Sequence, residues 1–159
     1  MSRVQAVLQR PTVRQFLKFC IVGASSTAID FTIYMLLIER LHIDRVLGVS
    51  LMVGRLLAQF ASFACAVSNG FYWNSRWTFR TEPGKDWKAT YFRFVLTNTI
   101  GLALNVTILS VVSHFVPDAL TNALAGRLRD PDGFLGKVCA TLVVVFWNFT
   151  ASKYWTFKK

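Results

Sequence analysis

The chain has 159 residues, of which 53% are apolar and 16% are charged, whereas soluble domains carry about 25% charged residues. Eighteen Lys and Arg against eight Asp and Glu give a net charge of +10. A basic excess first suggests a nucleic-acid-binding protein. Here, however, the basic residues lie between and beside long apolar runs, which favours a membrane protein with basic cytoplasmic loops and excludes nucleic acid as the expected partner.

Four apolar runs are long enough to cross a bilayer, which takes about 20 residues, or about 30 Å, of helix. The predicted spans lie at about 19–38, 46–73, 94–116 and 134–152. A soluble helical bundle is disfavoured because the third span has no charge on any face. The first span begins too late for a signal peptide and has no small-residue cleavage site after it. We therefore expect one all-α membrane domain over residues 1–159, with a short interfacial helix within 117–133.

The distribution of Lys and Arg predicts the orientation of the spans. The N-terminal segment, the loop between spans two and three, and the C-terminal segment hold twelve of these residues, against five in the other two connections. Both termini are therefore expected in the cytoplasm of a bacterial cell, with the spans in its cytoplasmic membrane. Lys137, near the start of the fourth span, is expected to snorkel towards that end.

An internal repeat divides the chain. Phe16–Phe19 recurs as Tyr91–Phe94, 75 residues later, and Trp77–Arg80 recurs as Trp155–Lys158, 78 residues later. The pattern predicts two copies of a two-span hairpin that both begin and end in the cytoplasm, so the repeats are parallel and related by an axis along the membrane normal.

Polar residues recur at helical spacing on one stripe of each span. They include Asp30 in span one, Arg55 and Gln59 in span two, Asn98 and Asn105 in span three, and Lys137 and Asn148 in span four. Small and polar residues on such a stripe can serve helix packing alone. Asp30 and Arg55 are costlier to insert into a membrane and favour a further role.

Asp30 lies ten residues before Arg40, and Arg55 lies ten residues after Arg45. Ten residues are about 15 Å of helix, so both charges are expected at similar depth on adjacent helices. Two interpretations stay open: a structural ion pair, or a functional pair in which Asp30 holds Arg55 for an anionic ligand.

Aromatic and basic residues gather where spans two and four end, at 73–80 and 152–158. They fit an aromatic belt with positive-inside anchors. They equally fit a vestibule in which Arg76 and Lys153 bind a lipid phosphate while Trp77 and Trp155 stack on its sugar.

The three cysteines are isolated in apolar runs, without metal spacing or a disulfide framework, and we interpret them as buried packing residues: Cys20, Cys65 and Cys139. No metal or other cofactor is expected. The sequence shows no nucleophile–base pair and no Gly-rich phosphate loop, so an enzyme is not expected.

Over residues 14–158, the chain resembles the GtrA family of four-span membrane proteins. The resemblance is carried by Phe16-x-Lys18-Phe19-x-x-Val22-Gly23 with Asp30, by Asn74–Phe79, by Phe92-Arg93-Phe94, and by Asn148-Phe149 with Lys153 and Trp155–Phe157. Asn74-x-Arg76-Trp77-Thr78-Phe79 is the most specific element. Lys153 and Tyr154 stand where arginines are frequent in the family.

The resemblance implies a role in cell-surface polysaccharide synthesis, as a flippase for a polyprenyl-phosphate-linked monosaccharide. Phosphate ligands would be Arg76, Lys153 and Arg93 at the cytoplasmic face and Arg55 midway. The polar ligands of the sugar would be Asp30, Gln59, Asn74, Asn98, Asn105 and Asn148. The prenyl tail would stay among membrane lipids, and four helices enclose so little volume that a homo-oligomer is a further expectation.

Two alternatives remain open. Some family members are thought to anchor or recruit a membrane glycosyltransferase without transporting, and the basic cytoplasmic residues would suit such a scaffold. A small multidrug-type exporter, in which one membrane carboxylate exchanges a cation for a proton, fits less well because Arg55 is expected at the depth of Asp30.

Overall fold

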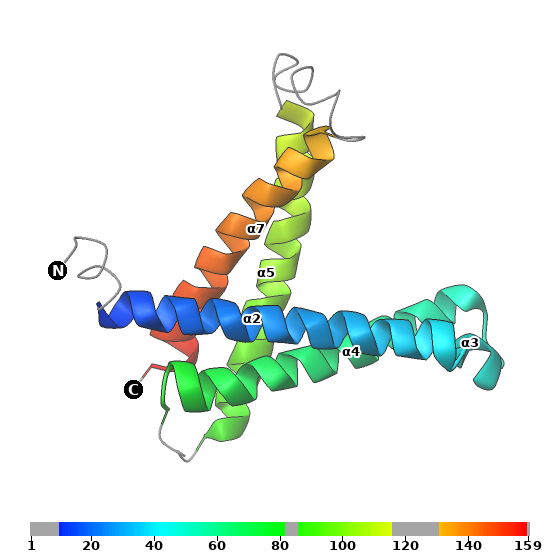
Figure 1. The fold of residues 1–159 in the computed structure, drawn as a ribbon, viewed down its shortest axis with the longest axis horizontal. Helices are drawn as coiled ribbons and strands as arrows, with labels where there is room; N and C mark the ends of the chain where they lie inside the picture. The colour runs from blue at the N-terminus through cyan, green and yellow to red at the C-terminus, as the bar shows by residue number, and fades with distance from the viewer. Residues whose placement is uncertain (1–9, 82–85, 116–130, 159) are drawn as a thin grey trace. The chain divides into compact units, whose positions relative to one another are not determined.

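The computed structural model describes residues 10–81, 86–115 and 131–158, in which every regular element is helical (Figure 1). The elements are α2 (Pro11–Met35), η1 (Leu36–Arg40), α3 (Ile43–Val46), α4 (Leu51–Trp73), η2 (Asn74–Thr78), α5 (Trp87–Phe115), α7 (Pro131–Ala151) and η3 (Ser152–Thr156). The three η elements are five-residue π-helical turns. The interfacial helix expected within 117–133 falls mostly outside the described residues.

Among the described residues, three stretches are long and apolar enough to cross a membrane: Pro11–Arg40, Leu51–Thr78 and Trp87–Val111. The chain is therefore a membrane protein with several apolar helices. α7 covers the fourth predicted span but begins at Pro131, where proline suits the first position of a helix. The chain divides into two compact units, one ending at Trp87 and the next beginning at Lys88.

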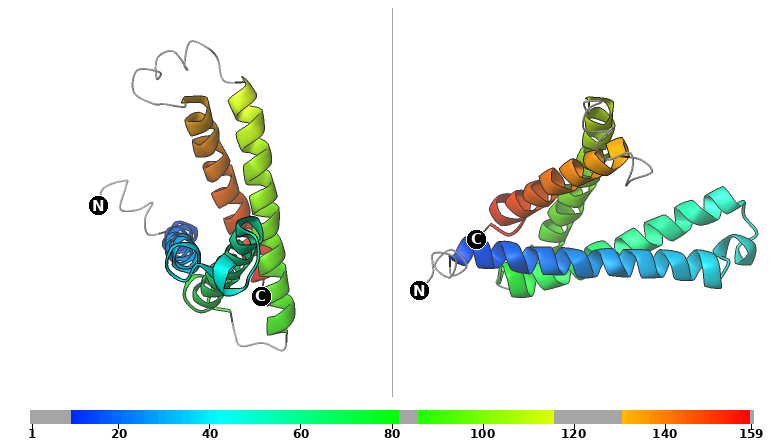
Figure 2. Two further views of the ribbon diagram at one scale, coloured as in Figure 1. Left: turned by 90° about the vertical axis from the view of Figure 1, so that its right-hand side faces the viewer. Right: turned by 45° about the horizontal axis from the view of Figure 1, so that its top comes forward.

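In the first unit, α2 and α4 form an antiparallel hairpin (Figure 2). The buried face of α4 carries small residues at every fourth position: Gly54, Ala58, Ser62, Ala66 and Gly70. Residues four apart lie on the same side of a helix. Their small side chains let the helix backbones approach closely, which is how helices associate in a bilayer without a hydrophobic driving force.

Hydrogen bonds set the register of this hairpin. The side-chain amide of Asn69 on α4 donates to the hydroxyl oxygens of Ser25 and Ser26 on α2, each over 3.1 Å. The buried face of α2 continues through Phe19 and Val22. Apolar contact and polar contact therefore alternate along the same interface.

The connection between the two helices is compact. Its short helix α3 packs directly on α4 at Gly54. The contact is so close that a Cβ atom added to Gly54 would stand 2.6 Å from Asp44 Cβ. α4 begins only at Leu51, with Ser50 as its N-cap, and not near Val46 as the sequence predicted.

In the second unit, α5 and α7 form the hairpin (Figures 1 and 2). The indole N–H of Trp147 donates to the carbonyl oxygen of Thr97 over 3.2 Å. Further along, the side-chain oxygen of Asn148 would lie 2.6 Å from a Cβ atom on Gly101. The absence of a side chain at Gly101 thus makes room for the amide.

The prediction that the cysteines are buried was wrong. Cys65 and Cys139 are exposed and Cys20 is half-buried. The helix seams are occupied by smaller residues such as Ser62 and Ala140, both fully buried. A thiol is apolar enough to lie on the outer surface of a membrane helix instead.

Gly54→Ala is expected to destabilise the first unit by about 1–3 kcal/mol, because the added methyl group overlaps the backbone and Cβ of Asp44. Gly23→Ala is the matched control, since nothing lies within 4 Å of its added Cβ and alanine favours the helix. Thermal unfolding in detergent should show a lower Tm for Gly54→Ala alone. Equal Tm values for the two variants would contradict the close contact.

Candidate functional site: polar seams and aromatic–basic helix ends

Both units end in the same local structure. α4 and α7 each continue into a π-helical turn, a rare element that is frequent at functional sites. The backbone N–H groups of Phe79 and Phe157 donate to the carbonyl oxygens of Asn74 and Ser152, each over 2.8 Å. The ring of Phe79 contacts Phe19, and that of Phe157 contacts Phe94, with ring centroids 6.2 and 5.7 Å apart. One aromatic contact thus anchors each turn to the first helix of its hairpin.

The π-helical turns bury polar side chains in both units. Asn74 and Thr78 are 2% and 3% exposed, and Ser152 and Thr156 are 0% and 3% exposed. The hydroxyl groups of Thr156 and Thr97 are hydrogen-bonded over 3.3 Å. In the described part of the chain, Thr78 Oγ1, Asn74 Oδ1 and Ser152 Oγ have no hydrogen-bond partner. The repeat pattern places Val22 where the second unit has Thr97, which accounts for the difference at Thr78.

Cations stack on aromatic rings at these helix ends. The guanidinium of Arg76 lies 5.0 Å from the centre of the Tyr72 ring, and the ammonium of Lys153 lies 5.3 Å from that of Tyr154. Such contacts hold a cation in place over the face of the ring. Arg93 and Trp155, two further predicted ligands, are exposed on their helices.

Lys18 also lies at the aromatic–basic end of the first unit, and the sequence did not predict it as a site residue. Its ammonium lies 5.1 Å from the Trp77 ring centre and donates to the Trp77 carbonyl oxygen over 3.4 Å. It therefore holds the end of η2 against α2. The recurrence of Lys18 as Arg93 in the repeat was the available signal.

The second unit carries a polar seam between α5 and α7, consisting of Asn98, Asn105, Lys137 and Asn148. Asn98 donates to the Phe94 carbonyl of its own helix over 2.8 Å. Lys137 donates to Asn105 Oδ1 over 3.4 Å. Asn148 Oδ1 is shielded from solvent and has no partner among the described residues. The seam thus offers an amide acceptor and an ammonium group to a polar ligand.

Asp30 and Arg55 do not form the expected ion pair. Asp30 is half-buried, and its shielded Oδ1 has no partner in the described ranges, whereas Arg55 and Gln59 are exposed on α4. The Asn69–Ser26 contact places Asp30 level with Cys65, and Arg55 level with Arg40. Arg55 lies only four residues, or about 6 Å, into α4. The prediction that Asp30 and Arg55 lie at equal depth assumed a helix that is continuous from Arg45. In the structure, α4 begins only at Leu51.

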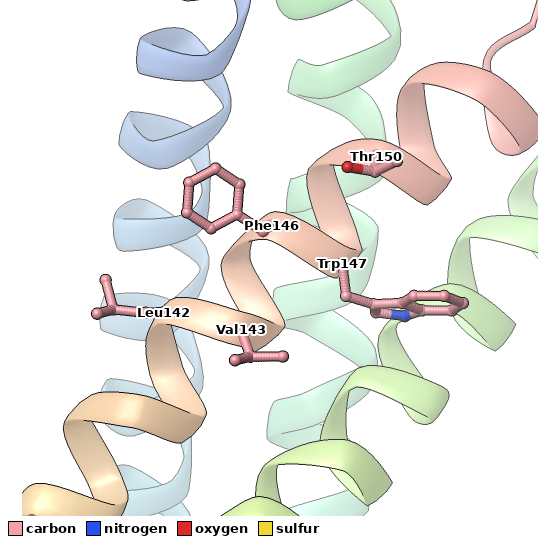
Figure 3. Close-up of a pocket in the computed structure, with 5 residues that line it drawn as sticks. All are labelled: Leu142, Val143, Phe146, Trp147 and Thr150. Atoms are coloured by element: carbon pink, nitrogen blue, oxygen red, sulfur yellow. The ribbon is translucent and has the colours of Figure 1, made fainter.

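An apolar hollow lies along α7, lined by Leu142, Val143, Phe146, Trp147 and Thr150 (Figure 3). The indole N–H of Trp147 is already bonded to Thr97. This surface consequently suits a hydrocarbon chain and offers an anion no cationic group.

The fold and these sites define a small helical membrane protein with polar seams and cationic, aromatic helix ends. The family model described as the GtrA/DPMS transmembrane domain matches residues 18–157, and the chain belongs to that family. It is 26% identical over 140 residues to an uncharacterized membrane protein, YngA, of Bacillus subtilis (strain 168), covering 88% of this chain and 77% of that protein. No solved structure matches the chain.

The two buried threonines of the π-helical turns should respond oppositely to the same substitution. Thr156→Val leaves the Thr97 hydroxyl without its partner and is expected to cost about 1–2 kcal/mol. Thr78→Val removes a buried hydroxyl that has no partner among the described residues and is expected to be neutral or stabilising. Tm measurements on both variants check this, and equal losses would show that Thr78 has a partner.

Asp30 and Arg55 should act independently on stability. Asp30→Asn removes a charge without stranding Arg55, so its effect on unfolding and that of Arg55→Gln are expected to add within about 0.5 kcal/mol. A double-mutant cycle measured by denaturant unfolding gives the coupling. Coupling of several kcal/mol, as for a buried ion pair, would mean that the two charges meet.

Proposed function

We propose that the protein translocates a polyprenyl-phosphate-linked monosaccharide across the bacterial cytoplasmic membrane for cell-surface glycan synthesis, and that it is not an enzyme. The supporting observation is that apolar helices carry shielded acceptors on their inner seams, Asp30 and Asn148, that have no partner in the part of the chain that the structure describes. Sugar hydroxyls would donate to such acceptors. The GtrA/DPMS family is generally linked to flipping glycan precursors, which agrees with this proposal.

The helix ends would receive the phosphate at the cytoplasmic face. Arg76 and Lys153 are held on aromatic rings, and Arg93 is exposed in the second turn of α5. Trp77 and Trp155 are 36% and 43% exposed, so part of each ring is open to stack on a sugar. The prenyl chain would stay in lipid, against surfaces such as the apolar hollow of α7.

Seam residues would then bind the sugar on its way. We assign hydroxyl contacts to Asp30, Gln59, Asn98, Asn105 and Asn148, and one at the cytoplasmic entrance to Asn74. Arg55 would bind the phosphate near the outer end of α4 rather than midway, because of its position in the first turns of that helix. A homo-oligomer would enlarge the enclosed path.

The proposed topology has four spans as two parallel hairpin repeats, with both termini in the cytoplasm. The matching π-helical turns, Asn74–Thr78 and Ser152–Thr156, support the repeat because they are 78 residues apart. The Lys and Arg count of twelve against five supports the orientation.

A membrane scaffold that recruits a glycosyltransferase is the second candidate. Its supporting observation is that Arg76 and Arg93 are exposed at helix ends, where they could pair with acidic groups of a partner protein. A scaffold has no use for unpartnered acceptors inside the hairpins, so substitutions at Asp30 discriminate between the two functions.

Liposomes containing the purified protein and a panel of labelled polyprenyl-phosphate sugars test translocation. Arg76→Gln and Lys153→Gln should each lower the outward rate about tenfold, because each loses a charged hydrogen bond to phosphate. Asp30→Asn should also lower the rate, and Lys88→Gln, an exposed lysine on α5, should not. If the wild-type protein recruits a glycosyltransferase but moves no labelled lipid, translocation is refuted and the scaffold function remains.

Cysteine labelling tests the topology. Gly84→Cys is expected to react only from the cytoplasmic side and Ala125→Cys only from the outside, in a background without the three native cysteines. A membrane-impermeant maleimide labels the outer face in spheroplasts and the cytoplasmic face in inverted vesicles. Reaction of Gly84→Cys from the outside would contradict the orientation.

A further inference from the structure

The exposed side chain of Lys137 extends along the second unit towards Asn105 on α5. Two contacts between α5 and α7 show this: Gly101 lies against Asn148, and Asn105 accepts from Lys137. Between these contacts α5 advances four residues, or about 6 Å, and α7 advances eleven, or about 16 Å. The lysine side chain bridges much of the difference by extending towards the middle of its helix. A snorkelling lysine, as the sequence predicted, would extend towards the Pro131 end.

The ammonium group keeps unused hydrogen-bonding capacity. It has three N–H donors, and within the described residues it makes one hydrogen bond, at the long distance of 3.4 Å, to a neutral amide. No carboxylate of the described residues pairs with Lys137. A cation without a counter-charge inside a membrane span is costly and usually marks a ligand path. The group that completes this environment should therefore be an anion.

Asn105 is suited to share that anion. Because its oxygen faces Lys137, its NH₂ group remains able to donate to a second acceptor. The repeat places Asp30 at the corresponding position of the first unit. An aspartate beside Lys137 would neutralise it, whereas asparagine leaves its positive charge available.

We propose that Lys137 and Asn105 form a phosphate-binding site within the membrane, at which the phosphate group of a lipid is bound by the ammonium and the amide. The site deepens the proposed translocation and rests on it, and it assigns a phosphate ligand to the seam between α5 and α7. The lipid phosphate reaches it between the cytoplasmic and outer ends of α7.

Binding to full-length protein in phosphatidylcholine nanodiscs tests the site. The probes are fluorescent polyprenyl phosphate and the neutral polyprenol of the same length. Lys137→Gln should weaken binding of the phosphate about tenfold and leave the alcohol unchanged, because only the phosphate loses a charged hydrogen bond. Lys137→Arg should retain the affinity within about threefold, since guanidinium also binds phosphate. Lys88→Gln is the matched control with the same loss of charge.

Asn105→Asp provides a second test that keeps Lys137 in place. The new carboxylate should pair with the ammonium and weaken phosphate binding by about as much as Lys137→Gln. Unchanged phosphate binding in Lys137→Gln, or an equal loss in Lys88→Gln, would overturn the site. Stronger phosphate binding in Asn105→Asp would overturn the role of Asn105.

Two further arms separate the remaining explanations. Displacement of the lipid by millimolar inorganic phosphate would identify a site for free phosphate and overturn the lipid assignment; no displacement is expected. Wild-type transport is measured in parallel. Binding through Lys137 without transport would refute translocation but keep the site, and transport that survives Lys137→Gln unchanged would refute the site but keep translocation.

Discussion

Close approach of α2 and α4 is the constraint on which the first unit depends. The four-residue series from Gly54 to Gly70 removes side-chain bulk from the interface, so packing and interhelical hydrogen bonds can act without a hydrophobic driving force. The contact between Asn69 and Ser26 then fixes which residues share a level. Through that register Asp30 is kept beside the small middle of α4, and Arg55 is placed near the end of the hairpin that carries α3.

Helical spans and helix-end clusters could be predicted from the sequence because they depend on local properties. Apolar length sufficed for the helices, and the recurring Trp-Thr-Phe pattern marked the two segments that the structure shows as π-helical turns, Asn74–Thr78 and Ser152–Thr156. Depth could not be predicted in the same way. It depends on the interruption of the helix between Val46 and Leu51, where Gly48 has a positive φ and Ser50 is the N-cap of α4.

The two units use one scaffold with different polar content. At corresponding positions the first has Asp30 and the second Asn105, and the buried hydroxyl of Thr156 finds Thr97 where the first unit has Val22. The first unit thus concentrates an acceptor on its inner face, and the second an ammonium group, Lys137. Acceptors for hydroxyl groups and a cation for phosphate are the groups that the proposed ligand, a lipid-linked sugar phosphate, would require.

Disulfide cross-linking in the membrane measures the register on which this account depends. In a background without native cysteines, Ser26→Cys with Asn69→Cys should cross-link on mild oxidation, because those side chains are in contact. Asp30→Cys with Arg55→Cys should not, since the register places these residues at different levels. Efficient cross-linking of the second pair without the first would contradict the account, and would restore Arg55 as the mid-membrane partner of Asp30.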